Sequence, residues 1–578
     1  MYNVWMTTSQ ITHEAIADVP LLMYVLHEKL GYDEILDQVS PPHGNWQGLS
    51  PGKTMVTWLA HLLSENNHYM SPVQDWVAQL PHLWAGLWGQ TVRPLDVSDD
   101  RLAEITRRLS LPEIWEPLEQ KITQRMVRVY ELPSEQVRLD TTTAKVYGGN
   151  DLSVLFQRGY SKDHRPDLRQ LKIMLAALDP LGVLVGADVV SGNTADDGLY
   201  IPMIARLRSS LPSEGLLYIG DCKMGALAIR AYVIQTGNSY LTPLAQVGDL
   251  PEQLEKWVDD AVRGKVRLQT VWDVDGKTRL GEAYEHHRRL SAETEMGTIT
   301  WSERVLIVHS VAYAKAAVRG LHQRLAQAQT DLRALTPPRG RGQRQFTEEA
   351  ALQTEVDAIL EHYAVSGLLT VKLQCETESR TVRAYGGAPA RSEERHRYFI
   401  KVKENRARLR MLEPRLGWRV YVTNAPVRKL PLGKAILAYR DEWLVERNCA
   451  RLKGRTLSLA PLWVRRDDHA LGLTRLLTLA ARVLAVAEYQ VRRTLAQDKC
   501  TLLGLYPGQP TRATAQPSTE RLLRAFKTVS LTLVKKGTQI FYLLTPLSEL
   551  QRTILHDFTC PSNLYQRWFP KSWKPLRI

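Results

Sequence analysis

The sequence contains few cysteines, and their positions exclude two kinds of site. Five cysteines are scattered through 578 residues, and no pair has the Cys-x-x-Cys spacing. A structural zinc site and a disulfide framework both need cysteines at closer and more regular intervals. We therefore expect neither, and the few scattered thiols indicate a reducing, cytoplasmic environment.

Export and membrane signals are also lacking. The first 16 residues contain no basic region followed by an apolar core, so we expect no signal peptide. The most apolar long segment, Leu471–Leu495, is interrupted by Arg475 and Arg482. Since a membrane span needs a nearly uninterrupted apolar run, this segment is predicted to be a buried helix, and we expect no membrane partner.

A phosphate-binding loop is lacking as well, although residues 52–54 read Gly-Lys-Thr. That motif requires a glycine where Gln47 stands, and a strand before the loop. Internal repeats and low-complexity tracts are absent too. The sequence is therefore ordinary globular material without a nucleotide-binding loop.

Positive charge, in contrast, is in excess. The chain has 75 lysines and arginines against 61 aspartates and glutamates, which gives a formal charge of +14. This balance favours a polyanionic partner such as nucleic acid. A ribosome-associated or membrane-surface protein would share it, so composition alone leaves these classes open.

The pattern of apolar residues divides the chain into five segments. We predict a helical N-terminal domain that binds DNA ends, the first part of an α/β core, a β-containing insertion subdomain, the second part of the core, and a basic, helical C-terminal tail. Their respective ranges are 1–130, 131–245, 246–425, 426–505 and 506–578. The insertion is too long for a loop, and so it must fold as a subdomain.

The first part of the core has a characteristic order of elements. Its residues predict three strands, a helix, a strand, a helix and a strand, at 136–140, 171–178, 183–190, 198–209, 216–220, 224–236 and 239–242. This is the order of a ribonuclease-H-like fold, a mixed sheet flanked by helices. Asp140 and Asp221 each fall at the end of a strand, and the first and fourth strands are neighbours in such a sheet. We therefore predict the two aspartates side by side.

A charged stretch later in the chain supplies a third carboxylate. Residues 439–453 contain no proline or glycine and are predicted to form one helix. Tyr439, Glu446 and Lys453 are spaced by seven, so they would share one face. A carboxylate between a phenol and an ammonium suits a metal ion held beside a phosphodiester. The alternative is a solvated charged helix, since charge runs usually face water.

Together these three acids predict a two-metal site. Hard oxygen ligands select Mg²⁺ or Mn²⁺, and two such ions about 3.5–4 Å apart can activate an attacking oxygen and stabilise a leaving one. We predict that Asp140, Asp221 and Glu446 are the catalytic residues and the ligands of two ions. For either aspartate alone, a turn or helix-cap role is the alternative.

Four motifs in this order resemble those of bacterial insertion-sequence DDE transposases of the IS-four superfamily. They read LDTTTAKVYG, GYSKDHRPDLRQ followed by GNTAD, YIGDCKMG, and YRDEWLVERNCARLKG, and the resemblance extends from about residue 15 to 490. The family signature is Tyr, two residues, Arg, three residues, Glu, six residues, Lys. Tyr439, Glu446 and Lys453 match it, but Glu442 occupies the arginine position. Arg440 is a substitute on a different face at best.

The resemblance implies a DNA transposase that binds transposon ends and catalyses Mg²⁺-dependent cleavage and strand transfer. The implied partners are double-stranded DNA, as terminal inverted repeats and as target, and a second copy of the chain in a dimeric synaptic complex. The implied location is the bacterial cytoplasm, in association with the nucleoid. Several relatives form a DNA hairpin with an aromatic side chain stacked on a flipped base. Trp272, Trp301 and Trp418 are candidates for that role, and buried core tryptophan is the alternative for each.

Basic side chains near the three acids are predicted to contact DNA, because phosphate contacts supply much of DNA affinity. They are Lys145, Lys162, Arg165, Lys223, Arg440, Arg447 and Lys453, together with the phenol of Tyr439. A solvated surface position is the alternative for the first four. Two other functions stay open, namely a non-catalytic or domesticated DNA-binding protein on this fold and a nuclease without strand transfer.

Overall fold

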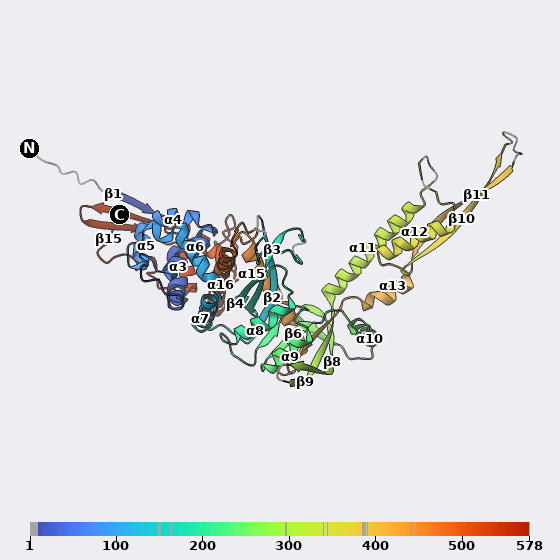
Figure 1. Cartoon of the computed structure of the whole chain (residues 1–578), viewed down its shortest axis with the longest axis horizontal. Coiled ribbons are helices and arrows are strands. Elements are labelled where there is room, and N and C mark those ends of the chain that lie inside the picture. Colours follow the sequence, from blue (N-terminus) through green and yellow to red (C-terminus); the bar gives the residue numbers. More distant parts are fainter. Residues whose placement is uncertain are drawn as a thin grey trace, which may run out of the picture. The chain divides into compact units, whose positions relative to one another are not determined.

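The structure is a computed structural model, and its parts are shown in Figure 1. It describes residues 10–147, 152–161, 165–294, 297–338, 340, 342–343, 345–383, 389, 391–441 and 443–576. The chain forms two compact units. The first comprises Met1–Thr242, Ser291–Trp301 and Ala438–Ile578, and the second comprises Pro243–Leu290 and Ser302–Leu437.

Helices dominate the first 130 residues. After the short strand β1 (Gln10–Glu14), the helices are α1 (Val19–Met23), a π-helical turn (Tyr24–Lys29), α2 (Tyr32–Val39), α3 (Pro51–Glu65), α4 (Ser71–Ala78), α5 (Pro81–Trp88), α6 (Asp99–Ser110) and α7 (Pro112–Tyr130). The start of α3 illustrates why they form. The Ser50 side chain accepts a hydrogen bond from the Lys53 amide, and Pro51 occupies the first helical position, where no amide hydrogen is needed.

The sheet of the first unit has the predicted strand neighbours. Its strands are β2 (Gln136–Val146), β3 (Arg169–Leu178), β4 (Val183–Ser191), β5 (Leu217–Ile219) and β6 (Ser239–Pro243), in the order β4-β3-β2-β5-β6. The first three pair antiparallel, and β5 lies parallel to both β2 and β6. Helices α8 (Tyr200–Leu207) and α9 (Leu227–Gln235) connect β4 to β5 and β5 to β6. The prediction that the strands beginning at 136 and 216 are neighbours is confirmed.

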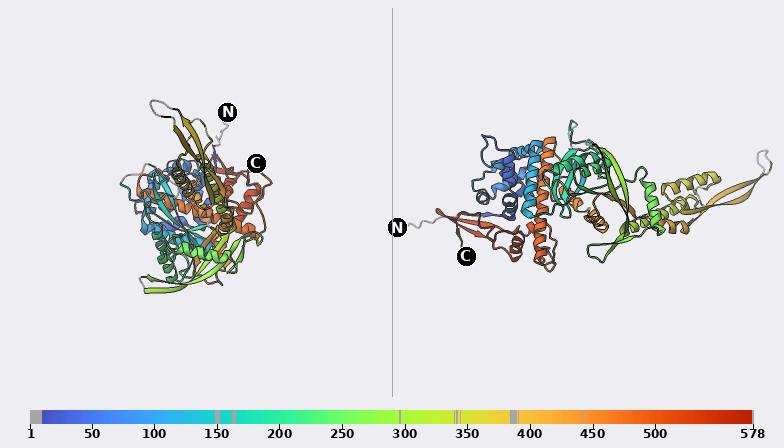
Figure 2. Two further views of the ribbon diagram at one scale, coloured as in Figure 1. Left: turned by 90° about the vertical axis from the view of Figure 1, so that its right-hand side faces the viewer. Right: turned by 90° about the horizontal axis from the view of Figure 1, so that it is seen from below.

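A long buried helix, α16 (Asp467–Gln497), packs against α6 and β4 (Figures 1 and 2). It is long and apolar enough to cross a membrane, but 94% of its most apolar window is buried inside the protein. Its arginines have protein partners: Arg482 pairs with Glu119 of α7, and Arg475 donates to two α6 backbone carbonyls at 2.8 and 2.9 Å. The predicted buried helix is confirmed.

The predicted single helix over residues 439–453 is wrong. Two helices occur instead, α14 (Leu432–Arg440) and α15 (Trp443–Lys453), and Asp441 between them lies in a turn. The reason is tertiary. The buried guanidinium of Arg138 donates to the Ala438 carbonyl near the end of α14 and to Asp179 at 2.5 Å. Tyr439 is therefore on a different helix from Glu446 and Lys453.

Packing against neighbouring elements fixes the direction of α15. Arg447 and Arg451 both pair with Glu488 of α16, and the Asn448 side chain donates to the Gly182 carbonyl at 2.7 Å. These residues contact neighbouring elements. Glu446 lies on the opposite side of the helix and is exposed.

The C-terminal tail contains strands as well as helices, so its predicted helical character is only partly correct. Helices α17 (Thr519–Arg524) and α18 (Glu549–Asp557) flank the hairpin of β13 (Leu531–Lys536) and β14 (Gln539–Leu544). Strand β1 pairs with β13, and β15 (Lys574–Pro575) pairs with β14. The two edge strands of this sheet, β1 and β15, come from opposite ends of the sequence. Local sequence patterns therefore did not predict the sheet.

The second unit contains both helices and strands. Its elements include α10 (Leu250–Val262), β7 (Gln269–Trp272), the first part of β8 (Arg279–Thr294), the last part of β9 (Gly297–Ser310), α11 (Val311–Leu335), α12 (Glu349–His362), β10 (Leu369–Val382), β11 (Arg391–Glu404), α13 (Arg406–Leu412) and β12 (Trp418–Thr423). Strands β12, β9, β8 and β7 are neighbours in that order, and β10 and β11 form a separate long hairpin. Buried leucines of α11 and α12 form an apolar cluster with residues of that hairpin.

Candidate active site

The strand register places Asp140 beside Asp221. The last residue pair between β2 and β5 joins Arg138 to Ile219. Asp140 follows that pair by two residues within β2, and Asp221 follows it by two residues just beyond the end of β5, and the charges of both carboxylates act on Tyr200. Both are partly exposed. The structure therefore brings together the two acids that the sequence separates by about 80 positions.

The prediction that Asp140 ends its strand is wrong in one respect. Strand β2 continues to Val146, and Asp140 pairs with Leu175 of β3 in its middle. Pairing with β5, however, stops at Arg138. The β-branched residues after Asp140 prolong the β3 side, while the short β5 leaves the other edge of β2 open where Asp140 lies.

Tyr200, in the first turn of α8, fixes the orientation of Asp221. Its hydroxyl donates to Asp221 Oδ1 at 2.7 Å, and the Lys223 amide donates to the same oxygen at 2.8 Å. Burial raises the pKa of Tyr200 well above its usual value, and the carboxylates of Asp221 and then Asp140 add to the rise. The phenol therefore remains protonated and acts as a donor. Sequence analysis missed Tyr200, because nothing in the spacing of its helix indicates which way it points.

Glu446 does not form one compact ligand group with the two aspartates. It lies in the first turn of α15, a helix that packs beside β2. Among the described residues, the three acids do not form a group whose ligand atoms all lie within 4.8 Å of one another. The structure thus unites two of the three predicted ligands and leaves the third on an exposed helix face.

The basic candidates fall into three situations. Lys223 and Arg440 are exposed, and Lys145 and Lys453 are partly exposed, as is Tyr439. Arg165 is exposed and forms a bidentate ion pair with Asp167 at 2.6 and 2.8 Å. Arg447 is partly exposed and pairs with Glu488, as described above. Lys162 lies outside the described residues, as does Glu442 in the arginine position of the family signature.

The three tryptophans considered for base stacking also differ. Trp301 and Trp418 are each 7% exposed, and their indole N–H groups donate to Tyr240 Oη and the Pro414 carbonyl at 3.0 Å. They are core residues of their respective units. Trp272 is 48% exposed. Exposure thus leaves Trp272 as the candidate among the three.

A further aromatic pair lies at the end of β2. Tyr147 stacks on Trp463 with ring centroids 5.3 Å apart, and Trp463 is 65% exposed. Backbone hydrogen bonds from Tyr147 to Leu462 at 3.0 Å and from Leu462 to Lys145 at 2.9 Å hold the two segments together. Sequence analysis missed this pair, although the basic and aromatic run PLWVRR around Trp463 was a usable signal.

Comparisons with known proteins give only weak structural similarity. No protein-family model matches the sequence, and no curated protein matches it. A solved structure of a piggyBac transposase synaptic complex with hairpin DNA is 9% identical, with a TM-score of 0.26. The match covers 50% of this chain and 62% of that one. A similarity of this extent identifies neither the fold nor the activity.

Proposed function

We propose that the protein is a DDE-type DNA transposase with a ribonuclease-H-like core. The proposal is supported by the parallel pairing of β2 with β5, since Asp140 and Asp221 each follow the last residue pair of these strands by two residues. The strand order β4-β3-β2-β5-β6, with helices between the last three strands in sequence, supports the fold assignment. The four sequence motifs and the excess positive charge support DNA as the substrate.

The proposed ligands of two Mg²⁺ or Mn²⁺ ions are Asp140, Asp221 and Glu446. Carboxylate oxygens fit these hard cations, and the partial exposure of both aspartates leaves room for water and substrate. Bound ions would polarise the attacking and leaving oxygens of a phosphodiester. Tyr200 and the Lys223 amide hold one oxygen of Asp221, which leaves the other oxygen for an ion.

Glu446 would supply the third carboxylate of this site. It is exposed in the first turn of α15, while Arg447, Asn448 and Arg451 hold the other side of the helix in place. Helix α15 packs beside β2, the strand of Asp140. Because the site would hold two ions, the three acids need not all lie within the ligand distance of one ion.

DNA engagement would rest on cations and an aromatic face near the acids. Lys145, Lys223 and Lys453 would contact phosphates, and Trp463 would stack on an exposed base. We propose two DNA ends bound by a homodimer, cleavage by water, and attack of the freed 3′ hydroxyl on target DNA. A bacterial, nucleoid-associated location follows from this proposal.

The test is cleavage of DNA that carries the inverted repeats flanking the gene, in the presence of Mg²⁺. Asp140→Ala and Glu446→Gln should each abolish cleavage and strand transfer, while end binding in a gel-shift assay stays within about threefold. Glu255→Gln, which changes an exposed glutamate of α10, is the matched control and should retain full activity.

Three outcomes would contradict the proposal in different ways. If Asp140→Ala cleaved DNA as the wild type does, the alternative of a non-catalytic DNA-binding protein would be favoured. Cleavage without joined products would indicate a nuclease without strand transfer. Full activity of Glu446→Gln would remove Glu446 from the site while leaving the two aspartates in it.

A further inference from the structure

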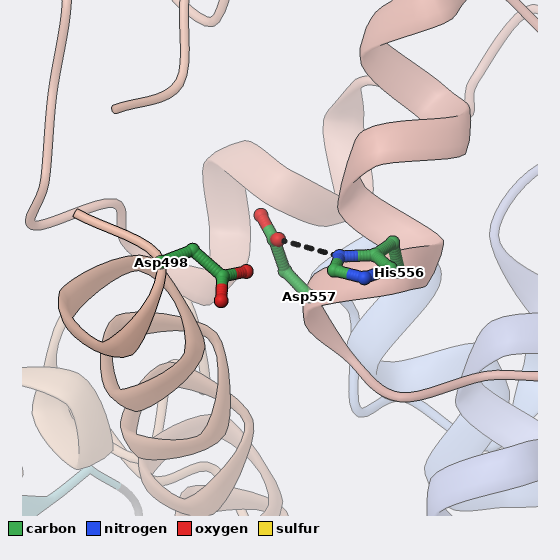
Figure 3. A group of neighbouring side chains, drawn as sticks. All are labelled: Asp498, His556 and Asp557. Carbon is green, nitrogen blue, oxygen red and sulfur yellow. Dashed lines mark hydrogen bonds and ion pairs between the residues drawn. The ribbon is translucent and has the colours of Figure 1, made fainter. Parts of the chain in front are cut away.

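A second group of metal-ligating side chains lies far along the chain from the proposed active site. Asp498 follows the last turn of α16, and His556 and Asp557 are the last two residues of α18. One ligand atom from each lies within 4.8 Å of the other two. Figure 3 shows the Asp557 carboxylate between the Asp498 carboxylate and the His556 ring.

The Asp557 carboxylate is buried without enough hydrogen bonds. The residue is 2% exposed, and its Oδ2 has no hydrogen-bond partner among the residues that the structure describes. Its Oδ1 lies 3.5 Å from His556 Nδ1, which is long for a hydrogen bond. A buried carboxylate oxygen without a partner is costly, and protein structures rarely leave one in that state.

The positions of the two aspartates add to this cost. Both stand at helix C-termini, where the backbone carbonyls carry partial negative charge and favour cations over anions. Two carboxylates and two helix C-termini therefore concentrate negative potential at one point.

We propose that Asp498, His556 and Asp557 bind one divalent transition-metal ion of the Zn²⁺ type. Two carboxylate oxygens and one imidazole nitrogen match the preferences of Zn²⁺, whereas Mg²⁺ and Ca²⁺ favour oxygen ligands alone. Asp498 and His556 are exposed, so water completes the coordination on their side.

The ion would have a structural role, with carboxylate and imidazole ligands in place of the cysteines whose spacing led us to expect no structural zinc site. It would tie α18, and with it the C-terminal sheet, to the end of the central helix α16. The link would add to a polar contact already present there, in which the Thr494 hydroxyl donates to the Asp557 carbonyl at 3.1 Å. Because the site uses none of Asp140, Asp221 and Glu446, it is independent of the proposed catalysis.

The test is zinc binding by the full-length protein after treatment with a chelator. Isothermal titration should show one zinc site in the wild type. His556→Ala and Asp557→Asn should weaken it by more than the roughly 10–100-fold that loss of an outer-shell partner costs. His362→Ala, which removes an exposed histidine from the last turn of α12, is the matched control and should bind like the wild type.

Thermal unfolding supplies a second readout that separates binding from misfolding. Zinc should raise the melting temperature of the wild type and of the Asp221→Asn variant, but not that of His556→Ala. His556 is exposed, so its variant is expected to fold. Equal zinc affinity of wild type and His556→Ala, or no zinc binding by the wild type, would overturn the proposal.

Discussion

Two carboxylate sites of the first unit differ in how the surrounding protein stabilises their negative charge. Asp221 receives hydrogen bonds from a phenol and a backbone amide, and it lies with Asp140 at a partly exposed edge of a sheet. Asp557 is buried at a helix end, and within the described part of the chain one of its carboxylate oxygens has no hydrogen-bond partner. A partly exposed pair of carboxylates, held in a fixed orientation, suits ions that exchange with substrate. A buried carboxylate that lacks hydrogen bonds suits an ion that stays bound.

The largest expected effect separates the two groups by function. Asp221→Asn should lower DNA cleavage by at least about 10³-fold, because it removes a proposed metal ligand and its charge. His556→Ala should leave cleavage within about twofold, since its group is structural. Single-turnover cleavage assays on both variants measure this difference, and equal losses would remove the distinction between the groups.

A smaller effect is expected from Tyr200→Phe, which removes one hydrogen bond to Asp221 but no ligand. We expect cleavage to fall by about 10–100-fold, as for other partners that orient a metal ligand. The variant should also need more Mg²⁺ for half-maximal activity. Because its raised pKa keeps Tyr200 protonated, the ratio of wild-type to variant rates should be the same at pH 7 and pH 9. A ratio that collapses at pH 9 would contradict this role.

The smallest effect concerns DNA binding near the partly exposed aspartate pair. Trp463→Ala should weaken binding of a DNA end with an unpaired base by about tenfold, because one stacking contact is lost. The salt dependence of binding should stay unchanged, since no cation is removed. Fluorescence anisotropy at several salt concentrations measures both quantities. Trp272→Ala is the matched variant, and a larger loss there would move the stacking role to the second unit.

Local sequence signals predicted much of the sheet and of α16. Apolar runs and β-branched residues predicted the strands, and the apolar run Leu471–Leu495 correctly predicted a buried helix. The prediction of a single helix over residues 439–453 was wrong because helix propensity depends only on residues that are close in sequence. The bonds of Arg138 to Ala438 and Asp179, which end α14, join residues far apart in the chain.

By itself, the sequence determined strands β2 and β5 and the positions of Asp140 within the first and Asp221 just after the second. The tertiary structure decided what surrounds them, because contacts between distant segments follow from packing and not from local pattern. It oriented Asp221 through Tyr200, paired Arg447 with Glu488 and left Glu446 exposed. It also brought Asp498, at the end of α16, close to His556 and Asp557, at the end of α18. The spacing of these residues in the sequence does not predict this proximity.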